Sequence, residues 1–144
     1  MGMDIKCVLQ KNTPNGKWVT IDQNCFDGRR IPPLFNYLEE FLLRGLPRDF
    51  VLSDLKDENG EAFYLGEPQY QGWLTLQEFC QEHLNTSNTD IYANFVLEKD
   101  RHGLLLRFPD RYETEEDMIL YYFALTFSHM FDNLDTYRLI FGFH

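Results

Sequence analysis

The sequence predicts an α+β fold, in which a mainly antiparallel sheet of three to five strands packs with about three helices. The length of 144 residues suits a single domain, residues 1–144. Apolar residues alternate in short segments near both ends, as in strands, and recur at helical spacing in segments between them. Only the last helical segment has strand-like segments on both sides, and this order favours an antiparallel sheet over repeated crossovers.

The first elements form a predicted hairpin. Apolar residues stand at alternate positions in residues 4–10, which predicts a strand. Thr-Pro-Asn-Gly at 13–16 is a strong turn signal, and residues 18–21 then form the returning strand. Residues 24–33, which hold a glycine and two prolines, are expected to be a loop.

A helix is predicted next, over residues 34–43, because its apolar residues recur every three or four positions. Gly45 and Pro47 end it. Residues 48–64 are polar and rich in turn formers, and residues 66–72 are expected to be irregular.

The second half begins with a capping box, in which Thr75 caps a helix that holds Glu78 and ends near Leu84. Residues 91–98 and 104–108 are predicted as an antiparallel hairpin; a helix followed by a strand is the alternative.

A further helix begins at Thr114 and ends at residues 133–135. It is apolar on more than one face, which predicts a central position or an interface. Alternation over residues 137–143 predicts a final strand.

The charge of the chain limits its partners. Thirteen Lys and Arg oppose 23 Asp and Glu, and the resulting net charge of −10 argues against general nucleic-acid binding. The acidity either keeps an aromatic-rich chain dissolved or faces a basic partner, such as a protein groove that normally holds nucleic acid. No apolar run is long enough to span a membrane, and no secretory signal is visible.

The cysteines and histidines predict neither a metal site nor a cofactor. Cys7, Cys25 and Cys80 include no Cys-x-x-Cys pair, and the first and last read as small core residues of a protein in reducing cytoplasm. The four histidines show no metal-binding spacing, and no nucleophile or phosphate-loop motif is present. No catalytic residue is therefore assigned.

Six short motifs follow one another along almost the whole chain. They are Gly2–Lys6, Gly16–Val19, Leu34–Leu38, Arg44–Asp49, Trp73–Leu76 and Tyr137–Phe143. In order and residue pattern they resemble a family of small proteins found in bacteriophage and bacterial genomes. That family carries Gly-x-Asp-Ile-His, Gly-x-Trp-Val, Leu-Phe-x-x-Leu, Arg-Gly-Leu-Pro-x-Asp, His-x-His-x-Trp-Leu-Thr-Leu and a closing Val-Arg-x-Val-Phe-x-Phe strand.

The chain departs from this pattern at three histidines. Lys6 stands where the family has the histidine of its first motif, and Gln69 and Gln71 stand where it has His-x-His. Glutamine keeps hydrogen bonds, but it neither moves protons near neutral pH nor binds transition metals well. A histidine-dependent activity of relatives is therefore not expected in this chain.

The motif positions also give the candidate binding residues. Seven polar or aromatic residues occupy them: Asp4, Lys6, Arg44, Asp49, Gln69, Gln71 and Trp73. Together they could line a pocket that orients a ligand or partner, and Arg29 and Arg30 could join them as an anion clamp. The alternative is structural, with Arg44 and Asp49 fixing the turn between them and Trp73 in the core. Arg138 is expected to pair with Asp4 across the sheet.

Three functions are compatible with these features. The favoured one is a non-enzymatic binding protein of phage or prophage type that inhibits a host protein, defence components included, in bacterial cytoplasm. The second is a sponge for a small anionic nucleotide, in which Trp73 stacks the base and arginines hold phosphates. The third is a degenerate nucleotide hydrolase, which requires His102 or His129 to cluster with carboxylates. The aromatic content of 16% also suits a homodimer face.

Overall fold

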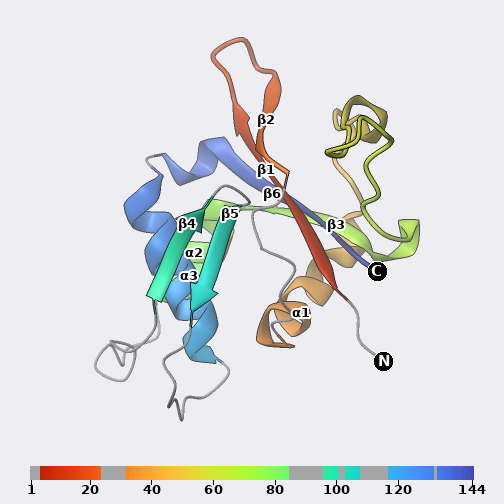
Figure 1. Ribbon diagram of the computed structural model, residues 1–144. Coiled ribbons are helices and arrows are strands. Elements are labelled where there is room, and N and C mark those ends of the chain that lie inside the picture. The colour runs from red at the N-terminus through yellow and green to blue at the C-terminus, as the bar shows by residue number, and fades with distance from the viewer. Residues whose placement is uncertain (1–3, 24–31, 85–95, 101–102, 108–116, 132) are drawn as a thin grey trace.

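The computed structural model describes residues 4–23, 32–84, 96–100, 103–107, 117–131 and 133–144 (Figure 1). Its centre is a four-stranded antiparallel sheet in the order β2-β1-β6-β3. The strands are β1 (Ile5–Asn12), β2 (Trp18–Asp22), β3 (Gln71–Thr75) and β6 (Tyr137–Phe143). The predicted α+β class with an antiparallel sheet is confirmed.

Three α-helices and a separate hairpin accompany this sheet. The helices are α1 (Pro32–Leu38), α2 (Leu76–Leu84) and α3 (Asp117–Met130), and the hairpin pairs β4 (Val96–Asp100) with β5 (Gly103–Arg107). Short 3₁₀ helices link them: η1 (Glu39–Arg44), η2 (Leu52–Asp54), η3 (Pro68–Tyr70) and η5 (Leu134–Thr136). Among the described helices, none combines the length and apolar character that a membrane span requires.

The strand register divides the sheet into two faces. Cys7, Phe141 and Gly72 stand side by side, as do Val8, Ile140 and Trp73 one position along. Because side chains alternate along a strand, these two rows point to opposite faces. The first row belongs to the helical face and the second to what we call the loop face.

The helical face holds the larger core. Phe79, Phe123, Phe127 and Phe141 are completely buried there, together with aliphatic residues of three strands: Ile5, Leu9, Leu74 and Leu139. Helix α3 buries Leu120, Phe123, Ala124 and Phe127 in this core. Cys7 and Cys80 lie in it as well, as predicted.

The loop face is covered by irregular chain rather than by helices. Residues 45–66, called here the cover segment, lie across it, to the right of the sheet in Figure 1. Leu55, Phe63 and Leu65 of this segment form a second, smaller core with Val8 and Ile140.

Gly142 in β6 permits the close approach of the cover segment. A Cβ atom at this position would meet the carbonyl oxygen of Leu65. The absence of a side chain therefore lets the backbone of the cover segment lie directly on the sheet.

Several predicted boundaries required correction. The prediction that residues 66–72 are irregular is wrong at its end, because β3 begins at Gln71. The single helix predicted over 34–43 is α1 followed by η1, and α1 begins within the predicted loop 24–33. The hairpin predicted over residues 91–98 and 104–108 is confirmed where β4 and β5 are described; residues 85–95 and 108–116 lie outside the described chain.

Candidate binding surface on the loop face

A buried arginine organises one end of the loop face. Arg138 of β6 is 3% exposed, and its neighbours in the sheet register are Gln10 of β1 and Thr75 of β3. Its Nε donates to Gln10 Oε1 at 2.9 Å, and its Nη1 donates to Asp49 Oδ1 at 3.0 Å. The guanidinium also lies 4.2 Å from the ring centroid of Trp18. We call Gln10, Trp18, Asp49 and Arg138 the Arg138 cluster.

These contacts compensate the burial of a charge. Desolvation lowers the pKa of Arg138, and the hydrogen bond and charge of Asp49 oppose that effect. Gln10 is itself buried and extends the hydrogen-bond network to β2, because its Nε2 donates to Thr20 Oγ1 at 3.1 Å. Within the described chain, Arg138 Nη2 has no hydrogen-bond partner. The cluster therefore joins three strands and the cover segment through one cation.

A cavity of about 430 Å³ opens beside this cluster. Gln10, Trp18 and Asp49 each line it. Its other walls come from β2, the residue that follows it and the cover segment: Val19, Thr20, Gln23, Phe50, Val51, Asp54 and Leu55. The cavity thus combines an aromatic and aliphatic wall with two carboxylates, and none of the described residues that line it is a lysine or an arginine.

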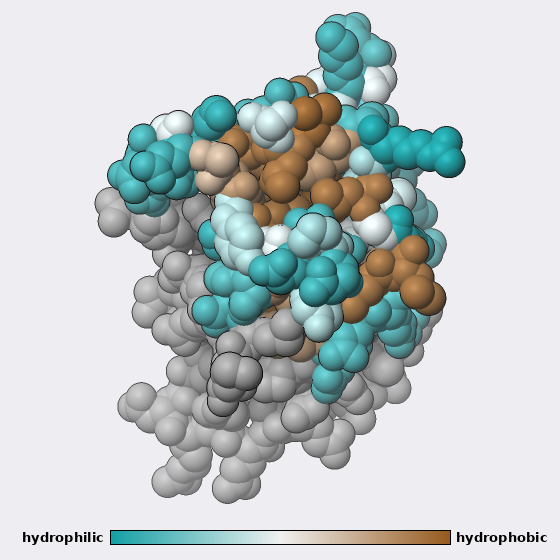
Figure 2. Space-filling model, turned by 90° about the vertical axis from the view of Figure 1, so that its right-hand side faces the viewer, coloured by the Kyte–Doolittle hydropathy of each residue, from teal (hydrophilic) through white to brown (hydrophobic). Residues whose placement is uncertain are grey.

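The cover segment and the turn after it are strongly acidic. Residues 45–70 contain six carboxylates and only two cationic side chains, Arg48 and Lys56. The carboxylates are Asp49, Asp54, Asp57, Glu58, Glu61 and Glu67, and all but the half-buried Asp57 are exposed. Figure 2 shows this side of the molecule, where apolar surface gathers above the centre and hydrophilic side chains border it.

Arg44 and Trp73, two of the predicted site residues, lie together at the β3 edge. The Arg44 guanidinium makes a two-pronged ion pair with Glu78, with distances of 2.8 Å and 2.5 Å. It also lies 5.2 Å from the ring centroid of Trp73. Arg44 therefore has a structural role, as the alternative to a binding role predicted, but it joins η1 to α2 instead of fixing the Gly45–Pro47 turn.

The capping box predicted from Thr75 and Glu78 is confirmed, and its hydrogen bonds contribute to the low pKa of Glu78 in this ion pair. Glu78 N donates to Thr75 Oγ1 at 3.1 Å, while Glu78 Oε1 accepts from Thr75 N at 3.0 Å. The hydrogen bond from Arg44 and those from Thr75 lower the pKa of Glu78 to about 2. This carboxylate is fully occupied by structural partners.

Lys6 and Gln71 flank Gly142 in the same row of the loop face. Lys6 Nζ lies 5.2 Å from the Phe63 ring centroid and 5.7 Å from that of Tyr64. Gln71 is buried, and its Nε2 donates to the Gly66 carbonyl oxygen at 3.0 Å. Both side chains hold the end of the cover segment against the sheet.

The remaining predicted residues do not complete a single pocket. Asp4 is exposed, and its backbone pairs with that of His144. The expected pair between Asp4 and Arg138 is wrong, because Arg138 contacts Gln10 and Asp49 instead. Gln69 is exposed in η3, and Arg29 and Arg30 lie outside the described residues. Arg44 with Trp73, and Lys6 with Gln71, are the only pairs of the described predicted residues that the structure brings together, while Asp4, Asp49 and Gln69 each lie apart from them.

The described histidines occupy separate surroundings. His83 packs against the rings of Tyr37 and Phe79, and His144 packs against Tyr64. His129 is exposed near the end of α3, and His102 lies outside the described chain. Within the described part, no three His, Cys, Asp or Glu side chains form a group that could hold a metal ion.

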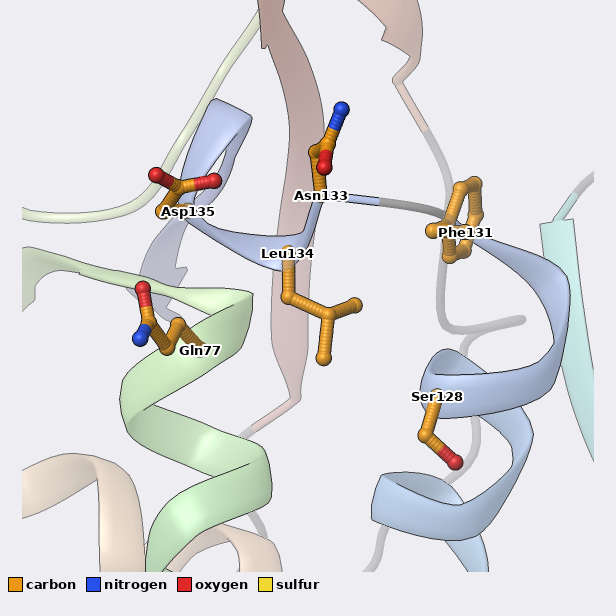
Figure 3. Close-up of a pocket in the computed structure, with 6 residues that line it drawn as sticks. All are labelled: Gln77, Ser128, Phe131, Asn133, Leu134 and Asp135. Atoms are coloured by element: carbon orange, nitrogen blue, oxygen red, sulfur yellow. The ribbon is translucent and has the colours of Figure 1, made fainter.

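A larger cavity, of about 520 Å³, lies between α2, α3 and η5 (Figure 3). Leu134 points into the space between the two helices, and Gln77 and Ser128 stand on either side. Ser128 Oγ donates to the Leu125 carbonyl oxygen at 2.7 Å, so its hydroxyl serves its own helix. Asp135 is the one carboxylate among the described lining residues, which makes this cavity the weaker candidate.

The sequence prediction missed most of the Arg138 cluster. Trp18 and Arg138 both stand in the motifs described above, yet only Asp49 was selected as a candidate. The available signal was a charged residue in an otherwise apolar strand, which implies a buried partner. No family model, curated protein or solved structure matches the chain.

Proposed function

We propose that the chain is a non-enzymatic binding protein whose loop face docks on a basic surface of a host protein and blocks it. The observation that carries this proposal is the concentration of six carboxylates in residues 45–70, around apolar surface and a cavity. An apolar centre with a charged border is the usual anatomy of a protein interface. Its negative charge favours a positively charged partner and speeds their encounter.

The rigidity of this face supports the same proposal. The cover segment has its own small core and is fixed by Gly142, Gln71 and the Arg138 cluster. A preformed surface loses less conformational entropy on binding than a flexible loop does. The phage or prophage origin of the chain rests on the motif resemblance alone.

The geometry gives less support to a nucleotide sponge. A sponge needs cations that are free to hold phosphates, but Arg44 is paired with Glu78. Arg29 and Arg30, the other arginines predicted for this role, lie outside the described residues. Trp73 is half-buried beneath the Arg44 guanidinium. Native mass spectrometry of the protein purified from a bacterial host tests this directly, since a retained small anion would favour the sponge.

The main test is quantitative affinity capture from bacterial lysate with a charge variant. Glu58→Gln/Glu61→Gln removes two exposed carboxylates of the cover segment. We call this the loop-face variant. The control variant, Glu39→Gln/Glu82→Gln, removes two exposed carboxylates from η1 and α2 and has the same net charge as the loop-face variant.

The proposal expects the loop-face variant to recover about fivefold less of a basic partner than the wild type, which corresponds to about 1 kcal/mol from two border charges. The control variant should capture as much of the partner as the wild type does, and high salt should reduce the amount that each of these two proteins captures. Equal losses in both variants would mean that net charge, rather than the loop face, governs capture.

A further inference from the structure

The cavity beside the Arg138 cluster has the charge of a cation site. Asp49 and Asp54 line it, and the side-chain carboxylate of Asp54 has no hydrogen-bond or ion-pair partner among the described residues. Both carboxylates are exposed, whereas Arg138, the cation that pairs with Asp49, is buried. An anionic ligand would meet two like charges here, so the charge of the site selects a cation.

The walls of the cavity favour a planar cation with an apolar stem. Trp18 is half-buried and lines the cavity, and Phe50 and Val51 stand across from β2 on the cover segment. Aromatic walls attract guanidinium groups, which are more weakly hydrated than ammonium groups and lie flat on a ring. Apolar walls suit the methylene stem of the same side chain.

The protein already shows this recognition with its own arginine. Arg138 lies 4.2 Å from the centroid of the Trp18 ring and donates to the carboxylate of Asp49 at 3.0 Å. The cavity presents the same two residues and adds Asp54 as a further acceptor. The residue types that hold one guanidinium internally are thus arranged to receive a second from outside.

We propose that this cavity receives an arginine side chain of the basic partner. The proposal rests on the proposed function, because it names the side chain by which the loop face recognises that partner. Asp54 would pair with the incoming guanidinium, and Trp18 would support its face. The volume of about 430 Å³ is within the range of pockets that enclose such groups.

A titration with small probes tests the cavity without any partner. The probe is N-acetyl-L-arginine amide, and its neutral isostere N-acetyl-L-citrulline amide is the control. Binding is followed by NMR at the indole N–H of Trp18, which Trp73→Phe assigns because the chain has two tryptophans. We expect a saturable shift with the arginine probe, reduced by salt, and a much smaller one with citrulline.

Three variants test whether the carboxylate of Asp54 binds the arginine probe. Asp54→Asn should weaken binding of the arginine probe about two- to fivefold, while Asp54→Glu, which keeps the charge, should bind within about twofold of the wild type. Glu82→Gln changes an exposed carboxylate of α2 that does not line the cavity and should leave the affinity unchanged. A preserved amide spectrum shows that each variant is folded.

Three results would overturn the inference: an unmoved Trp18 signal, equal binding of citrulline, or equal affinity of Asp54→Asn and the wild type. Its failure is distinguishable from failure of the proposed function. Capture that depends on Glu58 and Glu61 but not on Asp54 retains the function and rejects the arginine pocket. Arginine binding by a chain that captures no basic partner retains the pocket and rejects the function.

Discussion

Arg138 is buried in the central strand, where its guanidinium contacts a side chain from β1, one from β2 and one from the cover segment. A buried charge of this kind destabilises the fold unless each polar neighbour is satisfied. Gln10 is the neighbour most dependent on it, because Gln10 is also buried.

We therefore expect Arg138→Met to lower the free energy of unfolding by about 2 kcal/mol, because it leaves Gln10 Oε1 buried without a donor. Gln10→Leu combined with Arg138→Met removes both partners and should restore part of that loss. Urea unfolding of the two single variants and the double variant measures the coupling. Strictly additive losses would show that the hydrogen bond contributes nothing.

Glu78 makes a pH-dependent contribution to stability. Its pKa in the folded protein is about 2, below the ordinary value of 4.5, mainly because Arg44 donates a hydrogen bond to it. Because its pKa is lower in the folded protein, the ionised Glu78 stabilises the folded state at pH values above 4.5. This stabilisation is lost as the pH falls from 4.5 towards about 2.

Glu78→Gln should therefore cost about 1 kcal/mol at neutral pH, the size expected for a partly exposed ion pair, and almost nothing near pH 2. Unfolding curves of the wild type and the variant across this pH range measure the difference. Glu82→Gln, which changes an exposed carboxylate of the same helix, is the control and should show no such convergence.

The candidate site shows that sequence motifs do not determine which distant residues contact one another. Asp49 was selected from its motif, but its partner Arg138 is 89 positions away in the chain. A motif indicates that a residue has a role, whereas contact between distant motifs depends on the strand order. The sequence does not give the strand order, so it predicts a pair between Arg138 and Asp4. In the structure these residues lie on different rows of the sheet, since Arg138 stands opposite Gln10.

Elements with a strong local signal were predicted well. The hairpin of β1 and β2, helix α2 with its capping box, and strand β6 all lie within two residues of their predicted limits. Strand β3 was missed because Gln71, Gly72 and Thr75 give it no apolar alternation. Its strand conformation follows from pairing with β6, a contact that local sequence does not encode.

The cover segment is the element on which the loop face depends, and Gly142 is its attachment point. Gly142→Ala places a Cβ atom against the Leu65 carbonyl oxygen, so the segment must move away from the sheet. We expect a loss of about 3 kcal/mol in the free energy of unfolding and faster hydrogen exchange in residues 55–66.

Gly16→Ala is the matched control for this prediction. Gly16 lies at the β1–β2 turn with φ of 80° and no atom within 4 Å of an added Cβ. That variant should lose only about 1 kcal/mol, from backbone strain. Losses of equal size in both variants would contradict the proposed attachment at Gly142.

At the scale of the whole molecule, two buried thiols report on a shared core. Cys7 on β1 and Cys80 on α2 are 1% and 4% exposed in the helical-face core, and burial raises the pKa of Cys80 to about 11. In a Cys25→Ser variant, both should resist a thiol reagent in the folded protein and react in one phase during unfolding. Rapid reaction of either thiol alone would indicate local opening of that core.

The central position of β6 also has a consequence for synthesis on the ribosome. Strands β1 and β3 are made well before β6, which pairs with both, and Arg138 stands 128 positions after Gln10. Until residues 137–143 emerge, the inner edges of β1 and β3 have no β6 partner, and such edges invite pairing with other chains. The emergence of β6 supplies Gly142 and Arg138 as well, so the sheet and the acidic surface mature in a single late step.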